Sequence, residues 1–131
     1  MKSNYYLAKA ICFLYAILFT SCSAMMQNAN YTDHWSGSDD PGHVYATFDG
    51  FNGKQDFNAK KFSGDHMLVK YSVELRKGSM HLDIICSKKT VLSRDIADTV
   101  RDSILFDNPG HDPVKFILKA NSAAGKFDIS Y

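Results

Sequence analysis

Hydrophobic and polar residues alternate along much of the chain, and the alternation changes phase at a glycine. The odd-numbered positions are apolar over 69–75, and the even-numbered positions are apolar over 80–86. A period of 2 in β-branched and aromatic residues predicts β-strands. Gly78 and Ser79 lie between the two runs and suit a two-residue turn with positive φ at Gly78. The pattern therefore predicts a β-hairpin.

The register of this hairpin follows from its turn. Pairing Lys77 with Met80 places each apolar residue of one run opposite an apolar residue of the other, as a hairpin with one buried face requires. The expected pairs are Leu75 with Leu82, Val73 with Ile84, and Tyr71 with Cys86.

The end of the chain repeats the pattern around Gly125. A four-residue loop over 122–125 predicts a second hairpin, whose last residue Tyr131 faces the core and ties the final strand into the sheet. The expected pairs are Ala120 with Phe127, Leu118 with Ile129, and Phe116 with Tyr131.

Weaker alternation predicts further strands over 44–51, 57–62, 90–96 and 101–106, and residues 95–103 have room for one helical turn. Seven or eight short strands separated by glycine turns favour an all-β fold, a small antiparallel β-sandwich. A small β-barrel is the alternative.

The N-terminus has the pattern of a signal peptide. Lys2 and Lys9 accompany an apolar run that ends in L-Y-A-I-L-F-T-S-C over 14–22. Small residues before a cysteine predict a lipoprotein signal over 1–21 and a lipid on Cys22. An ordinary secretory signal, cut after Ala24 or Ala29, is the alternative. An uncleaved anchor is disfavoured, because about ten strongly apolar residues are too few to cross ~30 Å of hydrocarbon.

Residues 22–43 are rich in Ser, Asn, Asp and Gly and show no sustained period, which predicts a flexible polar tether after the lipidated cysteine. The β-sandwich domain is then expected over 44–131. Trp35 is the exception in the tether. It either packs back on the domain or is available to a partner, and the first arrangement is the commoner.

Charge and cysteine content exclude several classes. The chain has 15 Lys and Arg against 14 Asp and Glu, and removing Lys2 and Lys9 leaves 13 against 14. A near-neutral domain argues against a nucleic-acid partner, which would need a concentrated basic face. Cys86 would be the sole cysteine of the domain, so no intramolecular disulfide is expected. Its apolar neighbours predict a buried, inert thiol rather than a reactive one.

The lipobox-type signal, the polar tether, the segment Y-S-V-E-L-R-K-G-S-M-H-L-D-I-I and the closing A-N-S-A-A-G-K-F-D-I-S-Y resemble small bacterial envelope lipoproteins. These carry a single jelly-roll-like or immunoglobulin-like sandwich and are mostly uncharacterised. The resemblance implies a fold and a location, and it transfers no catalytic residue.

Candidate metal ligands are few. In the hairpin register His81 and Asp83 share the outward face and Glu74 lies opposite Asp83, so a cation bridging the three would relieve the repulsion of the carboxylates. Ordinary pairing with nearby basic residues does the same, and the ligand spacings typical of zinc or calcium are absent. No catalytic residue, metal site or cofactor is therefore expected.

Other motifs favour structure over chemistry. The segment D-G-F-N-G-K-Q-D over 49–56 lacks the alternating ligands of a calcium loop and suits a turn. Neither a nucleophile elbow nor a phosphate-binding glycine loop is present.

These observations favour a non-enzymatic binding or structural module, anchored to the membrane by its N-terminal lipid and binding a protein or a glycan. The location is the bacterial cell envelope, the outer membrane in a Gram-negative cell, or else the periplasm or exterior. A small envelope hydrolase or metal-dependent enzyme is the alternative, which a deep pocket converging on His and Asp or Glu would favour.

Overall fold

A computed structural model describes residues 32–131 of the chain. These residues form strands and no helix, so the turn of helix expected over 95–103 is wrong. No helix in the described part of the chain is long and apolar enough to cross a membrane. The strands are β1 (His34–Asp40), β2 (His43–Asn58), β3 (His66–Cys86), β4 (Lys89–Ile96), β5 (Thr99–Asp107) and β6 (Val114–Ser130).

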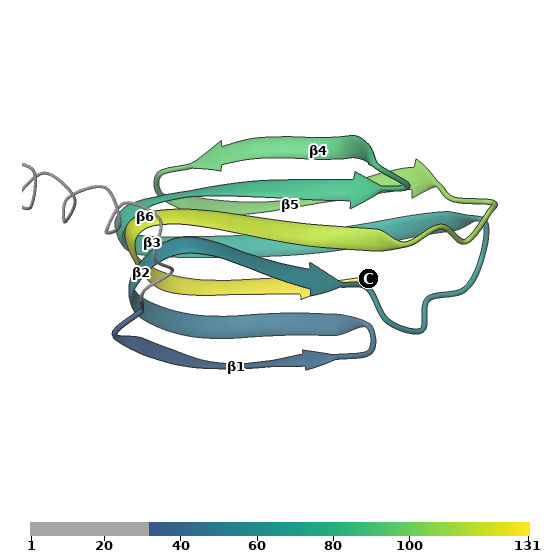
Figure 1. The fold of residues 1–131 in the computed structure, drawn as a ribbon. Coiled ribbons are helices and arrows are strands. Elements are labelled where there is room, and N and C mark those ends of the chain that lie inside the picture. Colours follow the sequence, from purple (N-terminus) through teal and green to yellow (C-terminus); the bar gives the residue numbers. More distant parts are fainter. Residues whose placement is uncertain (1–31) are drawn as a thin grey trace, which may run out of the picture.

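Two antiparallel sheets share the three long strands β2, β3 and β6 (Figure 1). Sheet I has the order β1, β2 over 43–48, β6 over 125–130, β3 over 66–75, and β5. Sheet II has the order β2 over 53–58, β6 over 114–121, β3 over 79–86, and β4. The predicted antiparallel β-sandwich is confirmed, but residues 32–131 form six strands, three of them long, rather than seven or eight short ones.

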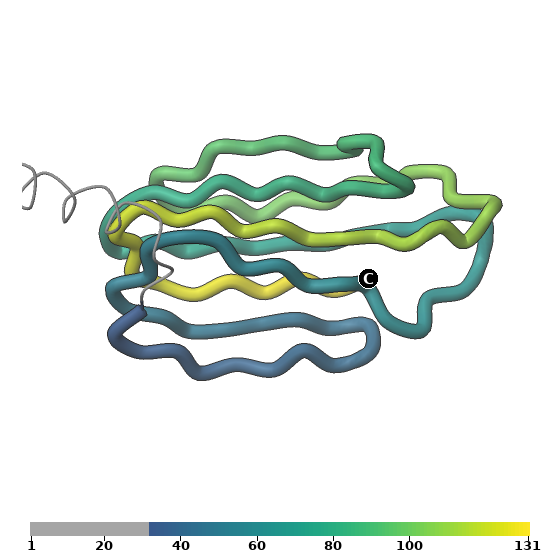
Figure 2. The backbone as a smooth tube through the Cα atoms, viewed as in Figure 1, coloured from purple at the N-terminus to yellow at the C-terminus, as the bar shows by residue number. Residues whose placement is uncertain are grey.

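Each long strand changes sheets at one end of the molecule, where β2, β3 and β6 double back together (Figure 2). The pairing of β3 with β6 shifts register between Leu75 and Ser79, and that of β2 with β6 shifts between Phe48 and Gly53. Such irregularities let a strand bend sharply and continue in a facing sheet. We call this end of the sandwich the corner. The D-G-F-N-G-K-Q-D segment lies at the corner of β2.

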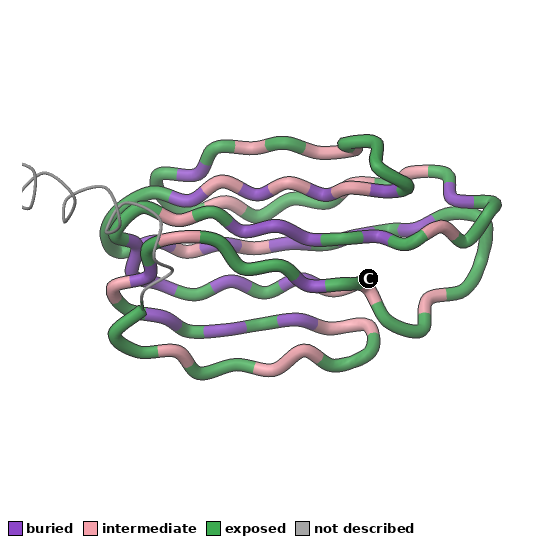
Figure 3. The backbone as a smooth tube through the Cα atoms, viewed as in Figure 1, coloured by how far each residue is buried: buried purple, intermediate pink, exposed green. Residues whose placement is uncertain are grey.

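The core fills the space between the two sheets. Buried and exposed residues alternate along β3 on both sides of its bend (Figure 3). The largest fully buried side chains come from both sheets: Phe48, Phe116, Phe127, Leu82, Ile84, Ile96, Leu118, Ile129, Val44, Val69, Val73 and Val114.

The hairpin predicted at Gly78 is wrong. β3 is one continuous strand, and Val73 pairs with Val100 and Phe127 rather than with Ile84. Leu82 pairs with Arg94 and Leu118. The two apolar runs therefore face the same core from opposite sheets.

The hairpin predicted over 122–125 is wrong for the same reason, because β6 also runs through its bend without reversing beside itself. Tyr131 nevertheless packs against the core, as expected. The centre of its ring lies 5.4 Å from that of Phe116. Phe116 belongs to sheet II, whereas Tyr131 follows the part of β6 that belongs to sheet I. The backbone N–H of Lys60 donates a 2.7 Å hydrogen bond to the Tyr131 hydroxyl.

A strand that bends at a corner produces the same sequence pattern as a hairpin. In both cases a glycine separates two period-2 runs of opposite phase, because the buried face must follow the core after the chain changes direction. At Gly78 φ is +74°, and a Cβ there would collide with the backbone of Asn121 and Ser122 in β6. Glycine is required here by a neighbouring strand as well as by the local conformation.

The domain begins before residue 44. Residues 34–40, placed in the tether by composition, form the edge strand β1. Trp35 packs back on the domain, with its ring 5.4 Å from Phe51 and 5.9 Å from both Phe48 and Phe127. Polar composition hid this strand because Trp35 is its single large apolar inward residue, and Gly37 and Asp39 occupy the other two inward positions. The signal, Cys22 and the rest of the tether up to residue 31 lie outside the described residues.

Candidate functional site

The outward face of sheet I differs from the rest of the described surface in its exposed apolar side chains. Three large hydrophobic residues are exposed in residues 32–131, and all of them lie on this face: Tyr45 at 41 %, Leu68 at 45 % and Leu105 at 66 %. Leu68 and Leu105 are direct neighbours on β3 and β5. Exposed apolar residues that gather on one face indicate an interaction surface.

A shallow open groove of about 640 Å³ crosses this face over β2, β6, β3 and β5. Glu74 lies at the end of the groove toward the corner and accepts hydrogen bonds from Arg101 at 2.8 Å and Lys126 at 3.1 Å. These two hydrogen bonds, that of Arg101 first, lower the pKa of the Glu74 carboxyl. The groove therefore contains ionised side chains that hold one another in place. Its polar lining also includes Thr47, Lys70, Ser72, Asp102, Ser103, Asp128 and Ser130.

Tyr45 provides the exposed aromatic surface of the groove. Its ring centre lies 4.8 Å from that of His43, the next outward residue on β2. His43 is held in turn by Asp128 of β6, with 2.9 Å between Nε2 and Oδ2. The tyrosine is thus supported by a neighbour that is itself fixed, which reduces the entropy that a ligand would lose by ordering it.

A second hollow of about 490 Å³ continues the groove toward the segment between β2 and β3. Lys70 and Ser130, cross-strand neighbours on β3 and β6, line both the groove and the hollow. The remaining lining residues are Lys61, Phe62, Ser63, His66, Met67, Leu68 and Tyr131. The two depressions together follow β3 from Glu74 to His66, roughly 27 Å at ~3.4 Å per residue.

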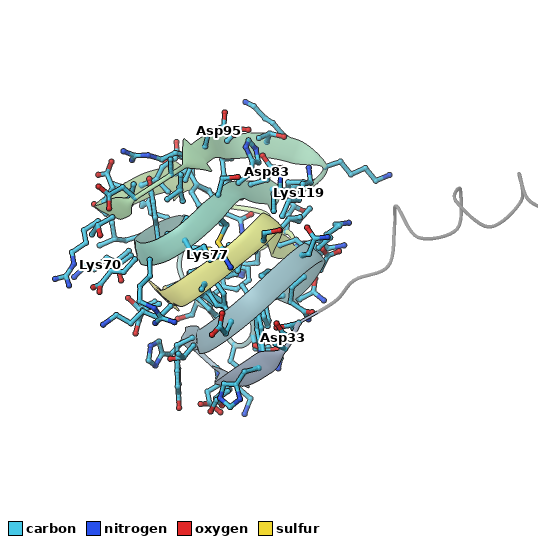
Figure 4. The ribbon with its side chains drawn as sticks, turned by 90° about the vertical axis from the view of Figure 1, so that its left-hand side faces the viewer. Asp33, Lys70, Lys77, Asp83, Asp95 and Lys119 are labelled. Carbon is cyan, nitrogen blue, oxygen red and sulfur yellow. The ribbon has the colours of Figure 1, made fainter. Side chains whose placement is uncertain are left out.

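The outward face of sheet II carries a cluster of charged side chains around His81. Its Nδ1 lies 2.5 Å from Asp95 Oδ1, and its Nε2 lies 2.9 Å from Asp83 Oδ1 and 3.0 Å from Ser93 Oγ. Ser93 donates a 2.7 Å hydrogen bond to Asp83, and Lys119 donates one of 3.2 Å. Figure 4 shows Asp83, Asp95 and Lys119 together, with Lys70 on the opposite side of the molecule.

Both pKa values at the centre of this cluster are shifted. The hydrogen bonds to Asp95 and Asp83 raise the pKa of His81. Burial opposes ionisation of Asp83, but the hydrogen bonds from Ser93, His81 and Lys119 outweigh it and lower its pKa to about 2. The cluster is therefore a hydrogen-bonded network whose carboxylates favour the protonated form of the His81 ring.

Ser93, His81 and Asp95 have the spacing of a nucleophilic triad but the wrong hydrogen bonds. A catalytic serine donates its proton to a neutral imidazole nitrogen. Here Ser93 donates to Asp83, and both ring nitrogens of His81 face carboxylates, which favours the protonated form of the ring. These hydrogen bonds link β3 to β4, and they do not match the serine-to-imidazole donation of a triad.

The predicted metal candidates are only partly brought together. His81 and Asp83 are in contact, but Glu74 lies on sheet I, beyond the bend of β3, so its predicted position opposite Asp83 is wrong. In the described part of the chain no group of three His, Cys, Asp or Glu side chains is arranged to hold a metal ion.

Sequence reasoning missed Asp95 and Ser93 as partners of His81 and Asp83. His81 and Asp83 are two residues apart on β3, and Ser93 and Asp95 are two residues apart on β4. This spacing places the two members of each pair on the same face of their strand. That spacing was visible, but the pairing of β3 with β4 was not. Cys86 is buried as predicted, and burial, followed by the charge of Asp112, raises the pKa of its thiol.

The chain matches no protein-family model and no curated protein. A solved structure described as "CBM4 structure and function" has 10 % identity and a TM-score of 0.47, covering 80 % of this chain and 76 % of that one. A carbohydrate binding module of family 29 has 13 % identity and a TM-score of 0.36, with 80 % and 75 % covered. Hydroxypropylphosphonic acid epoxidase from S. wedmorenis has 9 % identity and a TM-score of 0.31, and the match covers 77 % of this chain and 57 % of that one. These likenesses assign neither a ligand nor an activity to this chain.

Proposed function

We propose that this protein is a non-enzymatic binding module that takes an extended glycan along the outward face of sheet I. The observation that carries the proposal is the coincidence of three features on one face: the exposed ring of Tyr45, the open groove, and charged side chains held by one another. This face is built to meet a ligand, because it exposes apolar surface that the opposite face does not.

The ring of Tyr45 and the ion-paired side chains around Glu74 suit the two kinds of surface that a sugar offers. The C–H face of a sugar ring stacks on an aromatic side chain, and its hydroxyls both donate and accept hydrogen bonds. Tyr45 offers a ring with a polar end. Arg101, Lys126 and Glu74 offer charged donors and an acceptor, and hydrogen bonds to charged groups are the stronger kind. Strand spacing places Arg101 and Tyr45 about 14 Å apart across four strands, at ~4.8 Å per strand.

The shape of the site favours binding over catalysis. The groove is open along its length, and an open site does not exclude water from a reacting bond as an enclosed site does. The groove and the second hollow together have the length of a chain of several linked sugar rings. A flat polymer surface or a long oligosaccharide is the ligand that such a shape fits.

We further propose that a lipid on Cys22 holds the module on the bacterial envelope, on the outer membrane in a Gram-negative cell. The proposal rests on the signal pattern that ends at Cys22. It gives the module a fixed position beside the glycans of the cell surface or of its surroundings.

The test is a screen of the purified domain against a glycan array, followed by calorimetric titration of the strongest ligand. Tyr45→Ala removes the ring and is expected to weaken binding at least tenfold. Tyr45→Phe keeps the ring and is expected to retain most of the affinity. An absence of binding to any glycan, or a Tyr45→Ala variant with unchanged affinity, would overturn the proposal.

A protein partner is the second candidate, favoured by the adjacent exposed side chains of Leu68 and Leu105. Leu105 lines neither the groove nor the hollow. Leu105→Ser is therefore expected to leave glycan binding unchanged while weakening a protein contact. Loss of partner capture with Leu105→Ser, together with no glycan binding, would favour the protein partner.

A further inference from the structure

The side chains that line the second hollow are more basic than acidic. Lys61, Lys70 and His66 line it, and none of its described lining residues has a carboxylate side chain. His66 is held by Asp107, which lies outside the lining, with 2.7 Å between Nδ1 and Oδ1. Lys61 and Lys70 are the basic side chains of the lining that have no acidic side chain as a partner in residues 32–131.

Lys61 and Lys70 differ from the other cations of this face. In residues 32–131 neither makes an ion pair or a side-chain hydrogen bond, whereas Arg101 and Lys126 share Glu74, and Lys60 is paired with Asp39. Two carboxylates that line the groove together with Lys70 are also engaged. Asp128 is held by His43 and Asp102 by Arg94, so neither is free to neutralise Lys70.

Hydroxyl groups complete the lining beside the lysines. Ser130 pairs with Lys70 across β6 and β3, so the two side chains lie next to each other on the outward face. Ser63 adds another hydroxyl, and Phe62 adds an apolar wall. An ammonium beside hydroxyl donors suits a carboxylate or a sulfate, which accepts several hydrogen bonds and is strengthened by the charge.

We infer that the second hollow binds the acidic group of a sugar, and that the ligand of this module is an acidic oligosaccharide. The inference rests on the proposed glycan-binding function. A chain seated in the groove at Tyr45 reaches the hollow past Lys70 and Ser130, which belong to both depressions. An acidic sugar unit at that position neutralises Lys61 and Lys70 without displacing any ion pair of the groove.

The experiment compares the uncharged and the acidic form of the same saccharide chain, for two different saccharides. Dextran and carboxymethyl-dextran, and oligogalacturonate with its methyl ester, are titrated into the wild-type domain. At least one acidic form is expected to bind about tenfold more tightly than its uncharged counterpart. This preference is expected to fall as salt rises toward 1 M, where the Debye length shortens to ~3 Å.

Variants assign the preference to the hollow. The double variant Lys61→Met with Lys70→Met is expected to bring the acidic and uncharged forms within about twofold of each other. Lys77→Met is the matched control, because Lys77 is an exposed lysine at the corner (Figure 4) and lines neither depression. It is expected to keep the wild-type preference. All three lysines are exposed, so these changes leave the core intact.

The outcomes separate the inference from the proposed function. Equal affinity of the wild type for acidic and uncharged forms overturns the inference and leaves glycan binding in place. A preference that survives the double variant also overturns it. Absence of binding to every glycan overturns both. Vesicles that contain phosphatidylglycerol form a further arm, and binding to them without binding to an acidic glycan assigns the hollow to lipid headgroups and overturns the inference.

Discussion

Gly125 packs its backbone directly against the carbonyl oxygen of Glu74, leaving no room for a Cβ between β6 and β3. This contact lies where both strands leave sheet I for sheet II, just before the register shift that follows Leu75. Glu74 also projects its side chain into the groove, between Arg101 and Lys126. The corner that folds the sheet into a sandwich therefore also positions one end of the candidate site.

Gly125→Ala is expected to destabilise the domain by about 1–3 kcal/mol, the usual effect of adding a methyl group to a closely packed site. Urea denaturation followed by circular dichroism measures the change in free energy of unfolding. Gly110→Ala is the matched control, since a Cβ there would meet only Asp112, at 3.4 Å. Equal stability of the two variants would contradict the close contact at the corner.

Leu82→Ala is expected to lower the free energy of unfolding by about 2–5 kcal/mol, because Leu82 is fully buried between the sheets and its removal leaves a cavity. The control is Leu105→Ala, a truncation of the same size at an exposed position, for which a change within about 0.5 kcal/mol is expected. A loss below about 1 kcal/mol for Leu82→Ala would mean that this face of β3 is not core.

The His81 cluster is expected to make stability depend on pH in two opposite directions. The pKa of Asp83 falls from 3.8 to about 2 on folding, so its contribution is present above pH 3.8 and lost as the pH falls through about 2. The shift corresponds to a contribution on the order of 2 kcal/mol. The pKa of His81 rises from 6.5, so its contribution is present below pH 6.5 and lost above the raised value.

The measurement compares the wild type with single variants across pH. The stability difference between the wild type and His81→Gln is expected to be largest between about pH 4 and 6.5 and to shrink at alkaline pH. The difference for Asp83→Asn is expected to shrink as the pH falls toward 2. Differences that do not vary with pH would mean that neither group changes its pKa on folding.

Cys22 is expected to be lipid-modified. Metabolic labelling with a palmitate analogue is expected to mark the wild-type protein and to leave Cys22→Ser unmarked, because the thiol is the attachment point. The variant is also expected to leave the membrane fraction. Equal labelling of the two proteins would exclude Cys22 as the lipid site and favour an ordinary secretory signal.

The candidate site was only partly visible in the sequence. Alternation along β3 already assigned Lys70, Ser72 and Glu74 to an outward face, but it could not bring Tyr45 or Arg101 to them. Those residues come from β2 and β5, and their pairing with β6 and β3 depends on contacts between segments far apart in the chain. For the same reason Glu74 was placed opposite Asp83, and Asp95 was not recognised as a partner of His81.

The sequence by itself determined which positions are buried, since period-2 alternation follows the inward and outward faces of a strand whatever that strand pairs with. It thereby determined an all-β fold, a buried Cys86 and a change of face at Gly78 and Gly125. Only the tertiary structure decided that these glycines bend continuous strands instead of closing hairpins. Both arrangements bury the same residues, and what separates them is the close approach of β3 and β6 at the corner, a contact between distant segments that no local pattern records.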